Sequence, residues 1–228
     1  VICTGDGDIV TQLRQAGVPV EIVPLRPWRK MPSGILRYVD AGRLVVAVRR
    51  YRPALIHSSD MWLGNYLAWL KRRLNTPTIA HVRTPLGIRD IRKHRLRAAS
   101  GLISISQRAT RVLTEAGIPC TRVVQIEDGV DTERFHPRTE VSSVLPPSGG
   151  NIAEVNIGLV GRVEPAKQQL AFVEAAHRVT TALPGRTRFF LIGEVRAPDY
   201  FDRIQGRAEE LGLDGRLVCT GRREDMPE

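Results

Sequence analysis

The sequence predicts an α/β protein made of two doubly wound, Rossmann-like domains with parallel sheets. Short apolar runs alternate with segments whose apolar residues recur at helical spacing, first over residues 1–126 and again over residues 155–219. This alternation is typical of βαβ units, whose strands are parallel and joined by right-handed crossovers. Between the two blocks, residues 137–151 are rich in Pro, Ser and Gly and have no periodicity. They are therefore predicted to form a linker.

The first predicted domain covers residues 1–136. Its strands are expected at residues 1–4, 19–24, 53–57, 78–82, 101–105 and 122–126. Its helices are expected at residues 9–15, 35–50, 61–74, 88–97 and 107–116, with Gly42 a weak position in the second of them. Because the chain opens directly inside a strand, a first strand of this domain is expected to precede Val1.

The second predicted domain covers residues 152–228. Its strands are expected at residues 155–160, 187–192 and 216–219, and its helices at residues 166–182 and 199–211. Domains typically run to about 100–150 residues, so this domain is expected to be incomplete. Ligands of doubly wound folds bind at the carboxyl ends of the strands. A cleft between the two domains is therefore the expected site.

Positive charge is concentrated in the first part of the chain. The net charge is +10, and residues 1–150 hold 23 Lys and Arg against 12 Asp and Glu, whereas residues 151–228 hold 11 against 12. A basic surface attracts phosphates, nucleic acid or anionic lipid, although it can also be merely solvated. Aromatic residues make up 5% of the chain, which argues against a base-stacking surface, and no nucleic-acid partner is expected.

Cysteine usage and hydropathy indicate a cytoplasmic protein. The three cysteines, Cys3, Cys120 and Cys219, lie far apart and belong to no Cys/His cluster. We expect them to be buried free thiols in a reducing compartment, and we expect no metal site. No apolar segment approaches the roughly 20 residues of a membrane span. Any membrane association would then be peripheral, on the inner face.

The strongest candidate site lies where the strand at 155–160 meets the following helix. Gly161 permits a tight exit from the strand and close approach of a ligand to the backbone. A helix beginning near Ala166 would point its free N–H groups at the strand end, which favours an anion. Arg162 and Lys167 add a planar fork of donors and a mobile ammonium. This pattern predicts a phosphate or diphosphate site without a metal, although both could be ordinary surface charges.

Other predicted strand ends carry similar residues. Gly193 and Glu194 follow one strand of the second domain, and Arg222 follows the next. A carboxylate beside a phosphate pocket often binds sugar hydroxyls, so these residues are candidates for nucleotide binding. In the first domain, His81 lies at the end of a strand and Arg83 follows it. His81 is a candidate for hydrogen bonding to a substrate, although a lone histidine is more often structural.

The chain as a whole resembles a GT-B glycosyltransferase of the large retaining group called glycosyltransferase family 4. The segment IGLVGRVEPAKQQ is similar to the strand, Gly-Arg and Lys signature of that family. The segment VVQIEDGVDTERFHP is similar to the end of its first domain, and LVCTGRREDMPE resembles the strand and loop near its nucleotide base. His81 falls where the family often has a histidine at the cleft. Gln168 stands where a glycine is common, and Asp128 where an asparagine is usual.

The resemblance implies a retaining, metal-independent transferase that needs no cofactor. It would move a sugar from a nucleotide-diphosphate sugar to a glycan or lipid-phosphate-linked acceptor, as in polysaccharide or lipopolysaccharide synthesis. Arg162 and Lys167 would bind the donor diphosphate, His81 would be the catalytic-site histidine, and Arg83 would face the acceptor. The family's first Gly-rich loop and its glutamate pair would lie outside this sequence, so the chain by itself is expected to be inactive. A GT-B sugar-nucleotide epimerase and a basic membrane- or nucleic-acid-binding module are the alternatives.

Overall fold

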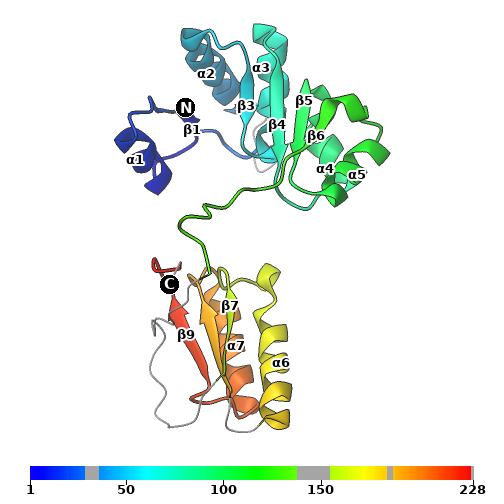
Figure 1. The fold of residues 1–228 in the computed structure, drawn as a ribbon. Helices are drawn as coiled ribbons and strands as arrows, with labels where there is room; N and C mark the ends of the chain where they lie inside the picture. Colours follow the sequence, from blue (N-terminus) through cyan, green and yellow to red (C-terminus); the bar gives the residue numbers. More distant parts are fainter. Residues whose placement is uncertain (29–35, 138–154, 184–186, 227–228) are drawn as a thin grey trace. The chain divides into compact units, whose positions relative to one another are not determined.

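A computed structural model describes residues 1–28, 36–137, 155–183 and 187–226. The chain divides into two compact units, which we call unit 1 (Val1–Gly129) and unit 2 (Val130–Glu228). All the paired strands are parallel, and helices separate them along the chain (Figure 1). The predicted α/β class with parallel sheets is therefore confirmed. Apart from Pro137, the predicted linker lies outside the described residues.

Unit 1 contains each strand and helix that the sequence predicts for residues 1–126. The strands are β1 (Ile2–Cys3), β2 (Glu21–Ile22), β3 (Ile56–Ser58), β4 (Thr78–Val82), β5 (Gly101–Ser104) and β6 (Val123–Gln125). The α-helices are α1 (Asp8–Gln15), α2 (Leu36–Tyr51), α3 (Gly64–Leu74), α4 (Ile88–Lys93) and α5 (Gln107–Glu115). Short 3₁₀ helices are η1 (Met61–Leu63), η2 (Leu96–Ala98) and η3 (Cys120–Arg122). The last turn of α3 carries Lys71, Arg72 and Arg73, which complement the helix dipole.

The strands of unit 1 form two sheets. One has the order β1-β2 and the other the order β3-β4-β5-β6. Among the described residues no hydrogen-bonded strand pair joins β1 to β3; instead, a cavity of about 500 Å³ is lined by residues of both strands and by α2 and α3. Apolar side chains such as Leu44, Val48 and Leu70 contribute to that lining. The expectation that a strand precedes Val1 stays a prediction.

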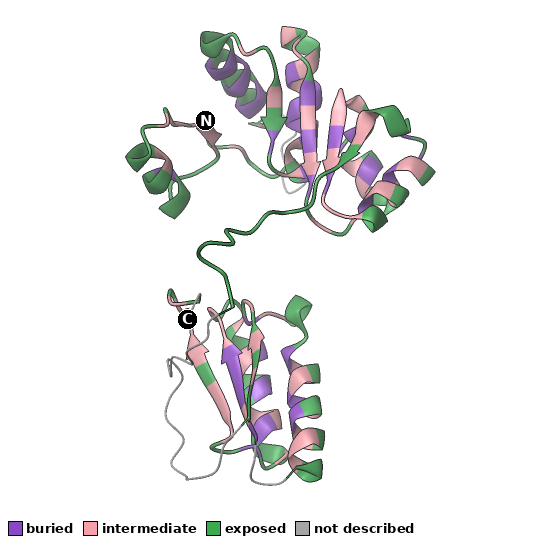
Figure 2. Ribbon diagram, in the orientation of Figure 1, coloured by how far each residue is buried: buried purple, intermediate pink, exposed green. Residues whose placement is uncertain are grey.

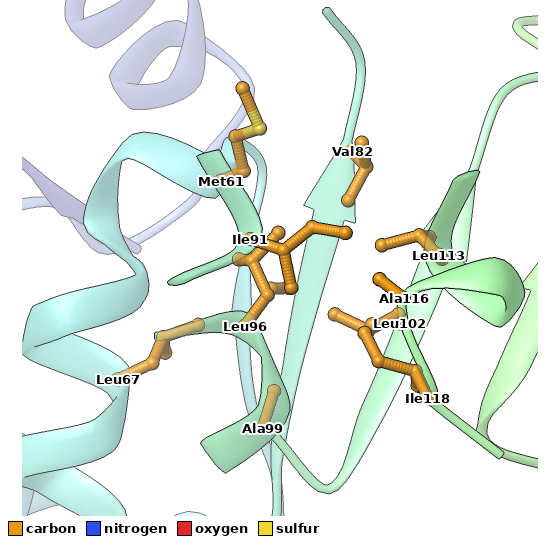
Figure 3. Packing of buried hydrophobic residues seen from close by; sticks show 11 residues of the cluster. Met61, Leu67, Val82, Ile91, Leu96, Ala99, Leu102, Leu113, Ala116 and Ile118 are labelled. Carbon is orange, nitrogen blue, oxygen red and sulfur yellow. The ribbon is translucent and has the colours of Figure 1, made fainter. Parts of the chain in front are cut away.

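The main core of unit 1 lies on β4 and β5. Alternate residues of these strands, Ala80, Val82 and Leu102, are at most 1% exposed, as the two-residue period of a strand requires. Helical side chains, including Ile91 and Leu113, pack onto them (Figure 3). This packing fixes the direction in which the carboxyl end of β4 presents its polar side chains.

The predicted helix at residues 88–97 is wrong in its second half. The helix α4 ends at Lys93, and Arg95 adopts a left-handed backbone with φ of 53° before η2 begins. The break lets Leu96, which is fully buried, turn into the core instead of continuing along a basic helix surface. Burying a leucine side chain is worth about 1.5–3 kcal/mol, which exceeds the cost of one left-handed residue, about 1–2 kcal/mol.

Unit 2 is a parallel sheet of order β7-β8-β9 with two helices. The strands are β7 (Val155–Val160), β8 (Thr187–Ile192) and β9 (Leu217–Gly221), and the helices are α6 (Gln169–Ala182) and α7 (Pro198–Glu210). Central strand β8 is the most buried, with Phe189, Phe190 and Leu191 each 1% exposed (Figure 2). Side chains of α6 and α7, such as Val173 and Ile204, pack on one another and on this strand.

The start of α6 differs from the prediction. Residues Pro165–Lys167 form a 3₁₀ turn, η4, and the α-helix begins only at Gln169. The two are separated by Gln168, whose backbone is left-handed with φ of 60° and ψ of 32°. The sequence pattern was continuous over this stretch, so the periodicity alone predicted one helix from Ala166. A glycine would adopt this conformation without the steric cost that glutamine bears.

We expect Gln168→Gly to stabilise unit 2. The substitution removes the steric energy of the left-handed backbone in the folded chain. This gain should exceed the entropic cost that arises because glycine has more freedom in the unfolded chain, so the net stabilisation should be about 0.5–1 kcal/mol. Amide hydrogen exchange of β8, which opens with the whole unit, should slow by roughly two- to fivefold. Gln168→Ala is the matched control, because alanine keeps a Cβ atom and therefore the strain. Equal exchange rates in the two variants would contradict the explanation.

Candidate functional site

The carboxyl ends of the three strands of unit 2 are joined edge to edge by backbone hydrogen bonds. The Gly161 N–H donates to the carbonyl of Ile192 at 2.9 Å, and the Gly193 N–H donates to that of Gly221 at 2.8 Å. Pairing continues beyond β7, because the Val163 N–H donates to the carbonyl of Glu194 at 2.9 Å. The three predicted strand-end segments therefore lie side by side at one edge of the sheet.

The loops after β7 and β8 lie so close together that position 193 has to be a glycine. A Cβ atom at this position would lie 2.1 Å from the carbonyl oxygen of Gly161 and 3.2 Å from the Arg162 nitrogen. Both are backbone atoms, so no side-chain rotation could make room. The backbone of Gly193 also has φ of 151°, which L-residues rarely adopt. The glycine after β8 thus holds the loop after β7 against its neighbour.

Gly161, Arg162 and Lys167 are brought together as the sequence predicts. A Cβ atom built on Gly161 would contact Cγ and Cδ of Lys167 at 3.8 Å, so the stem of the lysine lies along the glycine backbone. The 3₁₀ turn η4 carries Lys167 back to this position. Within the described part of the chain, the Lys167 ammonium has no ion-pair partner. It is the cation at this edge that remains available to an anion.

The arginines of the same edge are each paired with a carboxylate two residues away. Arg162 contacts Glu164 at 3.1 Å, Arg196 contacts Glu194 at 3.0 Å, and the pair of Arg222 and Glu224 is longer, at 3.9 Å. Their side chains are about half exposed, so these pairs are weak and exchangeable. The sequence predicts Arg162, Glu194 and Arg222 as separate ligand-binding groups, whereas in the structure each belongs to an ion pair. The spacing of one intervening residue in RVE, EVR and RRE was the signal for the pairs.

Two side chains that sequence reasoning missed hold the start of α6. Gln169 is fully buried, and its Nε2 donates to the carbonyl oxygen of Arg162 at 2.9 Å. Tyr200 of α7 accepts a hydrogen bond from the Leu170 N–H at 3.1 Å through its hydroxyl. One of the N–H groups that the sequence analysis assigned to an anion is thus satisfied by Tyr200. The helix predicted from Ala166 therefore begins as an α-helix only at Gln169, after the 3₁₀ turn η4, and the anion site at this turn stays a prediction.

The two predicted site residues of unit 1 lie at the end of β4. The ring centroid of His81 is 5.8 Å from that of His57, which follows from β3 pairing with β4. Within the described residues, Nε2 of His81 is buried without a hydrogen-bond partner. Burial, followed by the charges of His57 and Arg83, lowers the pKa of His81. The ring is therefore neutral near pH 7, and the role of His81 toward a substrate stays a prediction.

Arg83 forms an ion pair with Asp128 at 3.1 Å, with both side chains 49% exposed. This pair spans β5, because Arg83 follows β4 and Asp128 lies beyond β6. Asp128 is the residue that departs from the usual asparagine, and its charge gives Arg83 a partner that an amide would not provide. The distance of 45 residues in sequence explains why the pair was not predicted.

Two other expectations concern metals and thiols. Among the described residues, no group of three or more His, Cys, Asp or Glu side chains is placed to hold a metal ion. All three cysteines are free, but Cys120 and Cys219 are exposed and Cys3 is half-buried, so the expectation of buried thiols is wrong. No described helix is long and apolar enough to cross a membrane.

The fold and the strand-end edge define a doubly wound α/β protein of the kind that binds ligands outside the carboxyl ends of its strands. The model of the family described as Glycosyltransferase Family 4 matches residues 1–134, more than half of the chain. The chain therefore belongs to glycosyltransferase family 4. A search of curated proteins found no match.

Solved structures of GT-B glycosyltransferases share the fold. HepE of Anabaena in complex with UDP and glucose is 19% identical with a TM-score of 0.76, and the match covers 99% of this chain and 62% of that one. A glycosyltransferase from Rickettsia africae is 19% identical with a TM-score of 0.72, over 99% and 60%. Sucrose-phosphate synthase from Thermosynechococcus elongatus is 16% identical with a TM-score of 0.65, over 92% and 56%. The predicted GT-B fold class is confirmed, and the chain spans about three fifths of these relatives.

We expect Gly193→Ala to destabilise unit 2 by about 2–3 kcal/mol, because the new methyl group must push the backbone of Gly161 away. Amide exchange of β7 and β8 should accelerate by roughly 30- to 150-fold. Gly206→Ala on α7 is the control, since a Cβ atom there meets nothing within 4 Å and should slow exchange slightly. Similar exchange in both variants would show that the strand ends do not depend on the close approach.

The pKa of His81 gives a second test. In the folded chain, its titration by NMR should have a midpoint below the ordinary value of 6.5. His57→Ala should raise that midpoint, and Asp128→Asn should lower it further, because the carboxylate of Asp128 opposes the shift. The unfolded chain binds the proton more readily, so unit 1 should lose stability as the pH falls below about 6.5. A midpoint at or above 6.5, or one that both variants leave unchanged, would contradict this description.

Proposed function

We propose that this chain is part of an enzyme that transfers a sugar from a nucleotide-diphosphate sugar to a glycan or lipid-phosphate-linked acceptor. The observation that carries the proposal is the edge of unit 2, where Gly161 and Gly193 bring two loops together beside the ammonium of Lys167. Membership of glycosyltransferase family 4 supports the same class of reaction. The likeness to HepE, described in complex with UDP and glucose, supports a nucleotide-sugar donor.

In the proposed reaction, cleavage of the sugar–phosphate bond leaves negative charge on the nucleoside diphosphate. The Lys167 ammonium would bind this group directly. The Arg162 guanidinium would exchange its contact with Glu164 for a phosphate, which matches its planar fork of donors. Cations aimed at charge that develops in the transition state lower the barrier. We propose that these two side chains supply the charge without a metal ion or a cofactor, and that the anomeric configuration is retained.

The remaining predicted residues take supporting roles. Glu194 uses one carboxylate oxygen to bind Arg196, so its other oxygen is available to a sugar or ribose hydroxyl. Arg222 follows β9 at the third strand end, and we propose that it binds the nucleotide. In unit 1, His81 would hydrogen-bond a substrate through its buried nitrogen, and Arg83 would meet the acceptor. We place the enzyme in polysaccharide or lipopolysaccharide synthesis, in the cytoplasm.

The expectation that the 228-residue chain by itself transfers no sugar stays a prediction, because it spans 62% of the HepE chain that it matches. Binding can nevertheless be measured on this chain. We expect Arg162→Ala and Lys167→Ala each to weaken UDP binding, measured by calorimetry, by about ten- to a hundredfold. This is the value of a hydrogen bond to a charged group, about 1.5–3 kcal/mol. Glu164→Gln should strengthen binding, because it removes the carboxylate that competes for Arg162.

Arg178→Ala is the matched control for these variants. Arg178 lies near the carboxyl end of α6, at the opposite edge of the sheet from the strand ends, and its replacement changes the net charge equally. UDP affinity should be unchanged in this variant. An equal loss in the control would indicate a general charge effect, and parental affinity in both Arg162→Ala and Lys167→Ala would place the diphosphate elsewhere.

A further inference from the structure

The helix α2 has an exposed face that combines aliphatic side chains with arginines. Its buried face is formed by residues such as Leu44 and Val48, which pack in the core with α3. On the opposite side, Leu36 is 40% exposed, Val39 42% and Val46 56%. We use the name α2 face for six of the exposed residues of this helix, namely Leu36, Tyr38, Val39, Arg43, Val46 and Arg49. Since residues 39, 43 and 46 are spaced by four and three, they follow one line along the helix.

The α2 face is positively charged and has no compensating acid. Arg43 and Arg49 are exposed, and in the described part of the chain neither forms an ion pair. The neighbouring Arg50 pairs with Glu21 at 3.2 Å and lies at the edge of this face. Between them, α2 and α3 contain a single acidic residue, Asp40, which is 1% exposed and paired with Arg26.

Aromatic and basic side chains of α3 extend this surface. Tyr38 is 46% exposed, and its ring lies 5.4 Å from that of Trp69. The guanidinium of Arg73 lies 4.8 Å from the Trp69 ring, and Arg72 beside it is exposed. Tyrosine and tryptophan favour the interface between water and lipid, where an apolar ring and a polar group are both satisfied.

We propose that the α2 face binds the surface of an anionic lipid bilayer. The other face of α2 packs in the protein core, so the helix can lie in the plane of such a surface and present its exposed aliphatic residues and arginines to it. The guanidinium groups meet the lipid phosphates, and Val39 and Val46 enter the boundary with the acyl chains. A nucleic acid would use the arginines as well, but it would leave the three exposed aliphatic side chains without an apolar contact. Their presence favours lipid over nucleic acid.

This inference goes beyond the proposed sugar transfer, and its test measures no transfer. The 228-residue chain is sedimented with vesicles of phosphatidylcholine and with vesicles that also contain phosphatidylglycerol. Binding should require the anionic lipid. It should fall steeply as the ionic strength approaches about 1 M, where charges are screened within about 3 Å.

Two pairs of substitutions separate a specific face from net charge. Arg43→Gln with Arg49→Gln should weaken binding to anionic vesicles by about 25-fold, since each arginine near such a surface contributes about fivefold. The control is Arg108→Gln with Arg111→Gln on α5, which makes the same charge change on a helix at the far side of unit 1 from α2 (Figure 1). The control should bind within about twofold of the parent. Val39→Ser with Val46→Ser should remove the binding that persists at high salt.

The proposal is overturned by any of three results. Equal binding to neutral and anionic vesicles would show that charge is not used. Equal losses in the α2 and α5 variants would show a diffuse charge effect without a defined face. Binding of a single-stranded RNA that depends on Arg43 and Arg49, without vesicle binding, would assign the face to nucleic acid.

Discussion

The contact on which the candidate site depends is between two stretches of backbone. The loop after β8 passes so close to the loop after β7 that the Gly161 carbonyl occupies the space of a side chain at position 193. Three hydrogen bonds from Gly161, Val163 and Gly193 prolong the strand ladder into these loops. They hold Arg162 and the turn that carries Lys167 in place without using either charged side chain. The fold at this edge is therefore maintained by the backbone, and neither the ion pair of Arg162 nor the ammonium of Lys167 is needed for it.

The charged side chains at the strand-end edge of unit 2 repeat one arrangement. Three arginines at the strand ends are each paired with a glutamate of the same loop, so in the absence of a ligand their charges are largely compensated. Exposed pairs of this type contribute little to stability, about 0–1 kcal/mol. We propose that the two phosphate groups of the donor replace the glutamates, and Lys167 adds positive charge that these pairs do not balance.

The sequence predicted the order and type of the elements because their apolar periodicity reflects burial directly. The strands β4, β7 and β8 were predicted to the residue. The errors fall at Arg95 and Gln168, where non-glycine residues adopt left-handed backbone conformations. Neither residue type signals such a break. At Arg95 the burial of Leu96 overrides local propensity, a tertiary effect that a single sequence does not display.

In the candidate site, too, groupings of residues close in sequence were predicted, whereas contacts between residues far apart in sequence were not. The grouping of Gly161, Arg162 and Lys167 was predicted because the three lie within seven residues of one another at a strand end. The ion pair of Arg83 with Asp128 joins residues from different strand ends, and no spacing in the sequence indicates it. Gln169 was missed for another reason. From the sequence, a glutamine at the start of a helix is expected on the surface. In the structure it is buried, and its amide donates a hydrogen bond to the carbonyl oxygen of Arg162.

The arginines of the α2 face and those at the strand ends of unit 2 differ in whether they form an ion pair. In unit 2 the strand-end arginines have glutamate partners two residues away, and residues 151–228 as a whole hold nearly equal numbers of basic and acidic residues. In unit 1 the helix α2 exposes Arg43 and Arg49, which form no ion pair within the described residues, and aliphatic side chains lie between them. A small soluble anion can be bound by a cation that points into its site. An extended anionic surface is instead bound by several arginines without acidic partners, spread over one face of the protein. The same abundance of arginine thus produces two kinds of surface, and the position of the carboxylates decides which one forms.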